Sequence, residues 1–565
     1  MEPQLAQGLT RAESGAARRW PAAGDGPLIG LICLVLAVGL ILWFDNVHLE
    51  TTNGLWKSMD VAAWKANYRT AELRAPNYLY YPTMALFGQL LDGLGIFAGK
   101  AWKQLALINA AFAAVAVTIV HHLVLRLTGR RDLAAIAAFF QVGCGFFLVL
   151  AITNEDIMPS FTFMLGAMSA ASLTFGAPTW RQAIGVGLLF TAGLLGEWRL
   201  LFPVLPPLLL ALALSDGSLP TRAGRIVVFL LTVVGACLLV VNRTEGHVGA
   251  VGLPDVLWTG KGINSGWSGF SIDKLRLLGA GIGEYWWGGR NLTWAGDLPN
   301  FRFEWLTSLA IQAALLSLFV VFLWRQRGDR RWRATAIVFL GTFVAGEVMN
   351  AYSQPQDPQM QINVMPWLAL AWAIALAGRL HRPTAVLAVA ILGAAPLAYN
   401  VWAHAPQRGR DGRMQTAVAE LERLSDPTRT VFVYSGFEAT VTWQFLLWGQ
   451  RWEGVCDLGP APLAVPKFKW ISLFGSSVWH PDWTPAQHAE ALSKQLQCAV
   501  DKGYRLVAGP IWEGSAEHLA EKMITLGGAK TAQAMHEVMR RDFSSRIILE
   551  ASEEGSYSLL TPRPK

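Results

Sequence analysis

Apolar residues form a series of long runs in the first 402 residues of the chain, interrupted by short polar stretches. A helix that crosses the roughly 30 Å hydrocarbon core of a bilayer needs about 20 such residues. The runs predict about eleven transmembrane helices, near residues 27–44, 103–125, 133–151, 159–176, 183–197, 199–214, 224–242, 305–324, 334–351, 361–378 and 384–402. We therefore expect a polytopic α-helical membrane domain over residues 27–402, preceded by a short tail, residues 1–26.

The boundary between the fifth and sixth runs leaves two interpretations open. Gly196, Glu197, Trp198 and Arg199 interrupt a single long apolar region. The break separates either two spans or the two halves of a re-entrant segment.

The pattern changes after residue 403. Three short runs rich in β-branched and aromatic residues predict buried strands, at residues 430–434, 504–508 and 545–550. Thr484, Pro485 and Gln487 predict the start of a helix, because Thr caps the first turn, Pro suits the first helical position and Gln completes a capping box. Strands that alternate with helices indicate a small α/β domain within residues 403–565.

Two of the predicted loops are long, at residues 45–102 and 243–304. In the first, residues 50–73 mix aromatic and charged side chains in the manner of helices that lie on a membrane surface. Residues 78–88 are an aromatic and proline-containing segment that is too short to span. The second loop is rich in Gly and Trp and is predicted to form an ordered, irregular cover.

The composition supports a membrane protein and argues against one class of partner. The chain is 53% hydrophobic and only 15% charged, which is far more apolar than an ordinary soluble protein. Its 25 Trp residues are typical of side chains that anchor spans at the level of the lipid headgroups. The net charge of +7 does not indicate nucleic-acid binding, because the arginines concentrate in short loops between the spans.

These loop arginines predict an orientation. If every run spans, they all fall on one side, which the positive-inside rule assigns to the cytoplasm. They are Arg18, Arg19, Arg130, Arg131, Arg181, Arg222, Arg225, the arginines between positions 325 and 333, Arg379 and Arg382. The N-terminus is then cytoplasmic, whereas the two long loops and the C-terminal domain are extracytoplasmic.

The five cysteines do not indicate a metal site. Cys33, Cys144 and Cys237 fall inside apolar runs, where we expect inert thiols. Cys456 and Cys498 lie in the C-terminal region, and an extracytoplasmic location would allow them to form a disulfide.

Glu155 and Asp156 are adjacent carboxylates between the third and fourth runs. A charge beside the bilayer core costs roughly 2.5–3.5 kcal/mol, so one interpretation is that they line a water-filled functional site. The alternative is a polar turn that only connects two helices. Asp45 follows the first span on the same predicted side, so the fold can bring the three acids together; alternatively it is a solvated acid at a helix end. A carboxylate that accepts a hydroxyl proton is what group transfer to that hydroxyl requires.

The order of features along the chain is specific, although no single motif is. The acid after the first span is followed by an aromatic-proline segment at 80–83, an arginine-rich turn at 127–131, the acidic pair at 154–156 and the break at 193–199. This order resembles the GT-C superfamily of polytopic glycosyltransferases, in particular the branch with protein O-mannosyltransferases and the lipid A aminoarabinose transferase.

The resemblance covers about residues 27–215 and extends weakly to residues 352–366. It implies an inverting glycosyltransferase of the bacterial inner membrane. The donor would be a polyprenyl-phosphate-linked sugar, and the acceptor a lipid, glycan or protein on the outer face. The C-terminal domain would help to hold the acceptor or a partner.

The resemblance also implies roles for the acids. Asp45 would act as the base or position the acceptor, and Glu155 or Asp156 would support the site, with Asp156 favoured. The family commonly has Glu after the first-loop Asp, whereas Asn46 stands here. Glu50 and Asp60 are therefore rivals for the second acidic role in the first loop, and the sequence does not decide between them.

A departing phosphate needs a nearby cation, because developing negative charge in a water-poor site is where fixed positive groups help most. Arg199 is the first candidate, followed by Lys261, Arg290 and Arg302 in the second long loop. Each of these residues has the alternative of being an ordinary cation that anchors the chain at the interface.

Four residues are candidates for binding the sugar or the acceptor. They are His48 and Tyr81 in the first loop, and Gln356 and Asp357 in a polar insertion between two spans. The insertion has the alternative of being a plain turn shaped by its prolines. The sequence requires no cofactor, although paired acids are able to hold a divalent cation.

Two other classes of function remain open. A transporter or flippase of lipid-linked material would use acids at span ends as relays, and it predicts inverted repeats, which the sequence does not display clearly. A non-catalytic assembly subunit would keep the fold without the activity.

Overall fold

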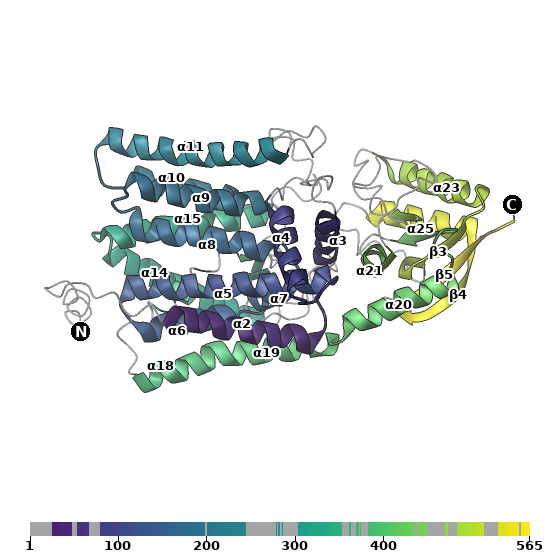
Figure 1. Ribbon diagram of the computed structural model, residues 1–565, viewed down its shortest axis with the longest axis horizontal. Coiled ribbons are helices and arrows are strands. Elements are labelled where there is room, and N and C mark those ends of the chain that lie inside the picture. Colours follow the sequence, from purple (N-terminus) through teal and green to yellow (C-terminus); the bar gives the residue numbers. More distant parts are fainter. Residues whose placement is uncertain are drawn as a thin grey trace.

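The computed structural model describes most of the chain. The described residues are 25–47, 53–66, 79–197, 201–244, 303–352, 382–434, 439–448, 469–472, 483–512, 529–552 and 555–564, with isolated helical residues within 278–285 and 361–373. All structural statements below concern this part of the chain. Helices that lie side by side form a bundle, and a smaller α/β domain adjoins one end of it (Figure 1).

Helices occupy the predicted apolar runs. They are α2 (Asp25–Phe44), α5 (Ala101–Thr128), α6 (Arg131–Gly143), α7 (Gly145–Ile152), α8 (Ile157–Thr174), α9 (Trp180–Gly196), α10 (Leu201–Ala213), α11 (Leu219–Thr244), α14 (Phe303–Arg325), α15 (Arg330–Tyr352), and α18 (Arg382–Val389) with η5 (Ala390–Ala394) and α19 (Ala395–His404). The predicted run 361–378 lies mostly outside the described residues. The break at Gly196 separates two distinct helices, α9 and α10.

Judged by the length and composition of the described helices, fewer than eleven of them are able to cross a membrane. Within the described residues, five helices are long and apolar enough to cross a membrane. The pair α6 and α7, bent by 71°, would make a sixth. The eleven predicted crossings therefore remain a prediction, although the helices themselves are present at the predicted places.

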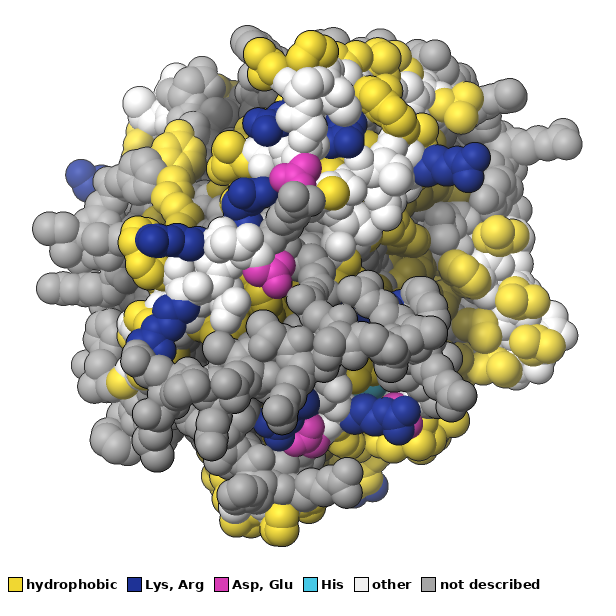
Figure 2. Space-filling model, turned by 90° about the vertical axis from the view of Figure 1, so that its left-hand side faces the viewer, with side chains coloured by type: hydrophobic (Ala, Val, Ile, Leu, Met, Phe, Trp, Pro, Cys, Tyr) yellow, Lys and Arg dark blue, Asp and Glu magenta, His cyan; other side chains and the backbone are white. Residues whose placement is uncertain are grey.

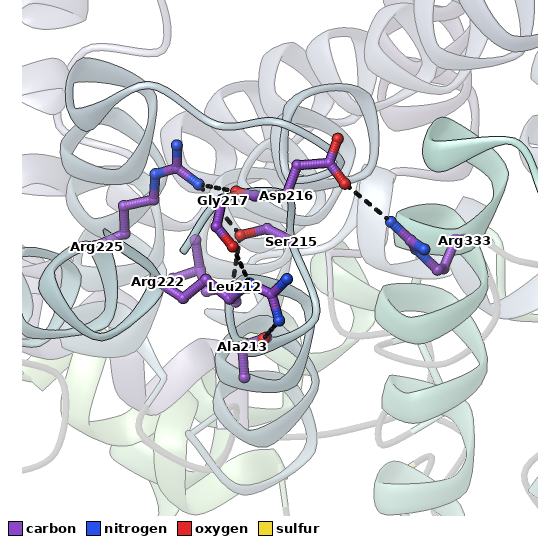
Figure 3. A network of polar contacts seen from close by, with 8 residues as sticks. All are labelled: Leu212, Ala213, Ser215, Asp216, Gly217, Arg222, Arg225 and Arg333. Carbon is purple, nitrogen blue, oxygen red and sulfur yellow. Dashed lines mark hydrogen bonds and ion pairs between the residues drawn. The ribbon is translucent and has the colours of Figure 1, made fainter. Parts of the chain in front are cut away.

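One end of the bundle, which we call the basic end, is rich in Arg. Figure 2 shows this face, with basic side chains distributed around it. Here Arg222 and Arg225 donate to backbone carbonyls that follow α10: Arg222 Nε to Gly217 at 2.9 Å and Arg225 Nη1 to Asp216 at 2.6 Å (Figure 3). Arg333 at the start of α15 pairs with the Asp216 carboxylate at 3.4 Å. Arg222 and Arg225 thus satisfy carbonyls of the turn that follows α10, and the Arg333–Asp216 pair fixes this turn against the start of α15.

The opposite end, which we call the domain end, carries two short helices, α3 (Asn53–Ala66) and α4 (Tyr80–Gly93). The segment predicted as an aromatic-proline dip is the start of α4, which exposes Leu86, Phe87 and Leu90. α4 lies at the end of the bundle, and α3 lies between α4 and the α/β domain (Figure 1).

The α/β domain contains a five-stranded sheet in the order β2-β1-β3-β5-β4. The strands are β1 (Thr430–Tyr434), β2 (Lys469–Ser472), β3 (Arg505–Ala508), β4 (Phe543–Ser552) and β5 (Gly555–Pro562). β1 pairs in parallel with β2 and β3, and β5 is antiparallel to both β3 and β4. All three predicted strands are present.

Four helices accompany the sheet: α20 (Arg410–Leu424), α21 (Ala439–Trp448), α23 (Pro485–Asp501) and α25 (Ala529–Asp542). α23 begins with the predicted capping box, in which Thr484 accepts from the backbone of Gln487. Cys498 on α23 is disulfide-bonded, while Cys456, its predicted partner, lies outside the described residues.

Hydrogen bonds join the domain to the end of α2. Gly409 precedes α20 in a left-handed conformation, φ 74°, which glycine adopts at little cost. Its N–H donates to the Phe44 carbonyl at 2.6 Å, and the Asp411 carboxylate accepts from the Val47 N–H at 3.3 Å. The start of the domain is therefore fixed directly beside Asp45.

Candidate functional site

The turn between α7 and α8 is held in place by side chains from two other helices. Asn109 on α5 donates to the carbonyls of Thr153 and Glu155, at 2.8 and 2.5 Å. Asn154 donates from its side chain to Ser58 on α3 at 2.8 Å, and from its backbone to Val47 at 3.2 Å. This turn, which carries the acidic pair, is therefore built into the domain end rather than left as a solvated connection.

Both acids of the pair are buried: Glu155 is 3% exposed and Asp156 is 5% exposed. Asp156 is the N-cap of α8, but its side chain makes no capping hydrogen bond. Its carboxylate instead forms an ion pair with Lys57 Nζ of α3 at 2.6 Å. The Asp156 side chain therefore lies beside two positive groups, the Lys57 ammonium and the N-terminal end of the α8 dipole.

Lys57 is the cation at the centre of this region. Its ammonium lies 5.7 Å from the centre of the Tyr81 ring. Burial alone would lower the pKa of Lys57, but Asp156, Tyr81 and Glu197 raise it above the usual value. Lys57 is therefore a fixed positive charge, held by acids from α8 and from the end of α9.

Tyr80 and Tyr81, at the start of α4, complete this wall of the site. Both are 2% exposed, and their rings lie 5.4 Å apart, edge to face. Burial raises the pKa of Tyr80 well above its usual value, and Asp156, Tyr81 and Glu155 add to the effect. The α4 start is tied to the end of α9, since Leu79 N–H donates to Leu195 at 3.0 Å.

Asp45 lies in the neighbouring loop but has a different partner. Its carboxylate pairs with Lys103 Nζ at 2.5 Å, and its side chain is 43% exposed. The backbone of Asp45 is left-handed, φ 47°, a conformation that Asp tolerates better than most residues. The loop of Asp45 and the turn of Asp156 are adjacent through the Asn154–Val47 hydrogen bond, so the structure contains two neighbouring ion pairs, one exposed and one buried.

The predicted site residues divide into two groups. Asp45, Tyr81, Glu155 and Asp156 lie at the domain end. Six predicted residues lie outside the described residues: His48, Arg199, Lys261, Arg290, Gln356 and Asp357. Their proposed roles in binding phosphate, sugar or acceptor remain predictions.

Sequence reasoning did not identify Lys57 or Glu197 as site residues. A signal for Lys57 was present, because it lies four and seven residues before Val61 and Trp64, which are 1% and 4% exposed. This spacing places the three side chains on one face of a helix, so a lysine in line with two core residues indicates a buried cation. Glu197 stands in the break at 193–199, from which only Arg199 was selected.

A metal centre finds no support in the described part of the chain. There, no group of three or more His, Cys, Asp and Glu side chains is arranged to hold a metal ion. A divalent cation at the acidic pair therefore remains only a possibility raised by the sequence.

Neither a family model nor a curated protein matches the sequence. Solved structures do match the fold. ArnT from Cupriavidus metallidurans, solved bound to undecaprenyl phosphate, aligns with 94% of this chain and 97% of its own, with a TM-score of 0.55 and 12% identity. The Archaeoglobus fulgidus oligosaccharyltransferase, solved in the apo form, aligns with 95% of this chain and 74% of its own, with a TM-score of 0.50 and 11% identity.

Both of these proteins are members of the GT-C superfamily. The alignments extend over 94% and 95% of this chain, and the chain therefore has the GT-C fold. The resemblance inferred from the order of sequence features is confirmed at the level of the fold.

Proposed function

We propose that the chain is a membrane glycosyltransferase that moves a sugar from a polyprenyl-phosphate donor to an acceptor at the domain end of the bundle. The observation that carries this proposal is the Lys57–Asp156 ion pair at 2.6 Å, which holds a cation at the domain end of a bundle with the GT-C fold. A solved structure of the same fold, ArnT, was obtained bound to undecaprenyl phosphate. A fixed ammonium at this place is suited to a lipid-linked phosphate.

Lys57 would bind the phosphate of the donor and stabilise it as it leaves. Its positive charge is held in place by Asp156, Glu197 and Tyr81, so no reorganisation is needed when negative charge develops on the phosphate. Preorganised charge of this kind is usually the largest contribution to catalysis. Asp156 and Glu155 act mainly through Lys57 and the turn that carries them.

Asp45 would act as the general base. Its carboxylate is the exposed acid of the two ion pairs, so an acceptor hydroxyl approaching from outside the bundle can reach it. The acceptor oxygen bonds to the anomeric carbon while the bond from that carbon to the phosphate oxygen breaks. The acceptor proton passes to Asp45, and polyprenyl phosphate leaves beside Lys57. A single displacement of this kind inverts the anomeric carbon.

The orientation of the chain follows the loop arginines in this proposal. The basic end would face the cytoplasm, and the domain end, with both ion pairs, would be extracytoplasmic. The disulfide at Cys498 supports this assignment, because disulfides persist in oxidising compartments. The inner membrane of a bacterium is the proposed location.

The proposal is tested with full-length protein in lipid nanodiscs. Undecaprenyl phosphate carrying a radiolabelled hexose, N-acetylhexosamine, pentose or aminopentose is supplied with membrane extract as the source of acceptors. We expect transfer from at least one donor by the wild type, and its loss in Lys57→Met and Asp45→Asn. Asp25→Asn is the matched control, because Asp25 pairs with Arg131 at 3.2 Å and is 44% exposed, but lies at the basic end.

Two results would contradict the proposal. Wild-type protein that transfers from none of the donors would exclude the activity for these sugar classes, and movement of the labelled lipid between leaflets would then support a flippase. Transfer that survives in both Lys57→Met and Asp45→Asn would reject the site assignment while leaving the activity in place.

A further inference from the structure

A second group of buried polar side chains is formed by Glu347 and Asn350, near the domain end of α15, and by Gln361. Gln361 donates to Glu347 Oε2 at 3.3 Å. Beside this contact, Glu347 Oε1, Gln361 Oε1 and Asn350 Oδ1 are buried without a hydrogen-bond partner, and the Asn350 amide lies within hydrogen-bonding reach of the Glu347 carboxyl group. Asn350 and Gln361 are 0% exposed. Unsatisfied polar atoms inside a bilayer cost free energy, and this group has no role in the mechanism above.

Contacts between neighbouring helices give the depth of this group. α10 and α15 run antiparallel, and they are fixed at the basic end by Asp216 and Arg333. Near their middle, a Cβ on Gly341 would lie 3.0 Å from the Pro207 side chain. Leu201, where α10 begins, and Glu347 are each six residues beyond this contact, which at 1.5 Å per residue is about 9 Å toward the domain end. Glu347 is therefore level with the start of α10.

The same level contains the site. The last turn of α9 lies beside the first turn of α8, because a Cβ on Gly193 would be 3.0 Å from the Ser160 carbonyl. α10 starts a few residues after α9 ends, so its first turn, the end of α9 and the start of α8 share one depth. α15 packs directly along α8, whose N-cap is Asp156. Glu347 and Asn350 are thus at the depth of the Lys57–Asp156 pair, on an adjacent helix.

We propose that Glu347, Asn350 and Gln361 form a subsite for the hydroxyl groups of the sugar on the lipid-linked donor. This inference rests on the proposed function. A carboxylate and two carboxamides offer both acceptors and donors, which is what a polyhydroxylated ring requires. The subsite is buried, so a hydroxyl that fills it satisfies atoms that otherwise have no partner. A donor without a sugar leaves them unsatisfied.

The subsite therefore recognises the sugar and contributes little to binding of the lipid phosphate. Lys57 supplies the phosphate contact, and Glu347, Asn350 and Gln361 add affinity only when a hydroxylated ring is attached. This division predicts that the two contributions can be removed separately.

The test measures binding, so that it does not depend on turnover. Full-length protein in nanodiscs is titrated with undecaprenyl phosphate alone and with the same lipid carrying each of the four sugar classes. We expect the wild type to bind at least one sugar-bearing lipid about tenfold more tightly than undecaprenyl phosphate, the ratio that one satisfied buried hydrogen bond provides. Asn350→Leu and Gln361→Met should abolish this advantage and leave the dissociation constant for undecaprenyl phosphate unchanged.

Val348→Ala is the matched control, because Val348 lies on the same turn of α15 but is 54% exposed and faces away from the cluster. Gln361→Met keeps the length of the side chain, so it reports on the polar atoms even if Asn350→Leu disturbs the helix. The inference is overturned if the variants keep the sugar advantage, if they weaken both ligands equally, or if the wild type has no advantage for any of the four sugars. A wild type that binds the sugar-bearing lipid preferentially but transfers nothing would reject the proposed function and leave the subsite in place.

Discussion

Lys57 and Met59 stand two residues apart on α3 and face opposite sides of the helix, about 200° apart. Lys57 pairs with Asp156 of the bundle. Met59 is 2% exposed and lies in an apolar cluster with residues of the α/β domain, among them Phe432, Tyr434 and Tyr557. α3 is therefore held between the two parts of the molecule. The α/β domain sets the position of the cation that we assign to the phosphate.

This arrangement predicts that Met59→Ala impairs transfer from a distance. Truncating a buried Met leaves a cavity that costs roughly 2–5 kcal/mol, and the domain face loses its contact with α3. We expect a lower melting temperature and a weaker affinity for undecaprenyl phosphate, measured in nanodiscs. Met59→Leu, which costs less than about 1.5 kcal/mol, should restore both. Weakened stability with unchanged affinity would show that the domain does not position Lys57.

Removal of Lys57 should have two separable effects. Lys57→Met leaves the Asp156 carboxylate buried without its cation, which costs roughly 3–5 kcal/mol. It should also lower the transfer rate about 10²–10³-fold, since a preorganised charge at the phosphate is lost. In the double variant Lys57→Met/Asp156→Leu we expect thermal stability to recover while transfer stays low. If transfer recovers together with stability, Lys57 has only a structural role.

Asp45 is predicted to control the proton rather than the fold. Asp45→Asn keeps the shape of the side chain and should lower transfer about 10²–10⁴-fold, the range that general-base catalysis contributes. Its melting temperature should change little, because exposed ion pairs such as Asp45–Lys103 contribute only about 0.2–1 kcal/mol. Lys103→Met offers a comparison in which the ion pair is lost and the base is kept. A larger loss of transfer in Lys103→Met than in Asp45→Asn would argue against Asp45 as the base.

The acid sensitivity of α4 follows from Asp92. Burial raises the pKa of Asp92, but hydrogen bonds from Lys65, Gln104 and the Gly99 backbone together lower it by more. The pKa of Asp92 is therefore lowered overall. A carboxylate with a lowered folded-state pKa contributes stability that is present above its unfolded value, about 3.9, and is lost as the pH falls through the folded value. Asp92→Asn should therefore be less stable than wild type at pH 7, and the difference in melting temperature should disappear as the pH falls through the lowered pKa of Asp92 in the folded protein. A difference that persists at low pH would show that the carboxylate charge is not responsible.

The fold was more predictable from the sequence than the site. Apolar runs predict helices because each run must satisfy its backbone within the bilayer, and the capping box at Thr484 is a local signal that needs no knowledge of the fold. The ion pair between Lys57 and Asp156 joins residues 99 positions apart, and no local pattern specifies it. Asp156 was identified because acids beside apolar runs are rare, whereas Lys57 resembled an ordinary cation of an interfacial helix. The group at Glu347 was missed for a similar reason, since its polar atoms meet only when α15 is placed.

Gly196 is a position where the backbone of α9 comes close to α8. It ends α9, directly before Glu197, and a Cβ there would overlap with Ser160 Oγ on α8, which is 1% exposed. Gly196→Ala should push α9 away from α8, move Glu197 from its place near Lys57, and weaken both stability and binding of undecaprenyl phosphate. Removing the Ser160 hydroxyl should relieve the overlap, because the Ser160 Cβ would be 3.4 Å away, an ordinary contact. We therefore expect Gly196→Ala/Ser160→Ala to recover most of both properties.

Gly185→Ala is the control on the same helix, because nothing lies within 4 Å of its added Cβ, and it should be neutral or slightly stabilising. Equal losses in Gly185→Ala and Gly196→Ala, or no recovery in the double variant, would show that the close approach of α9 to α8 does not position the acids around Lys57.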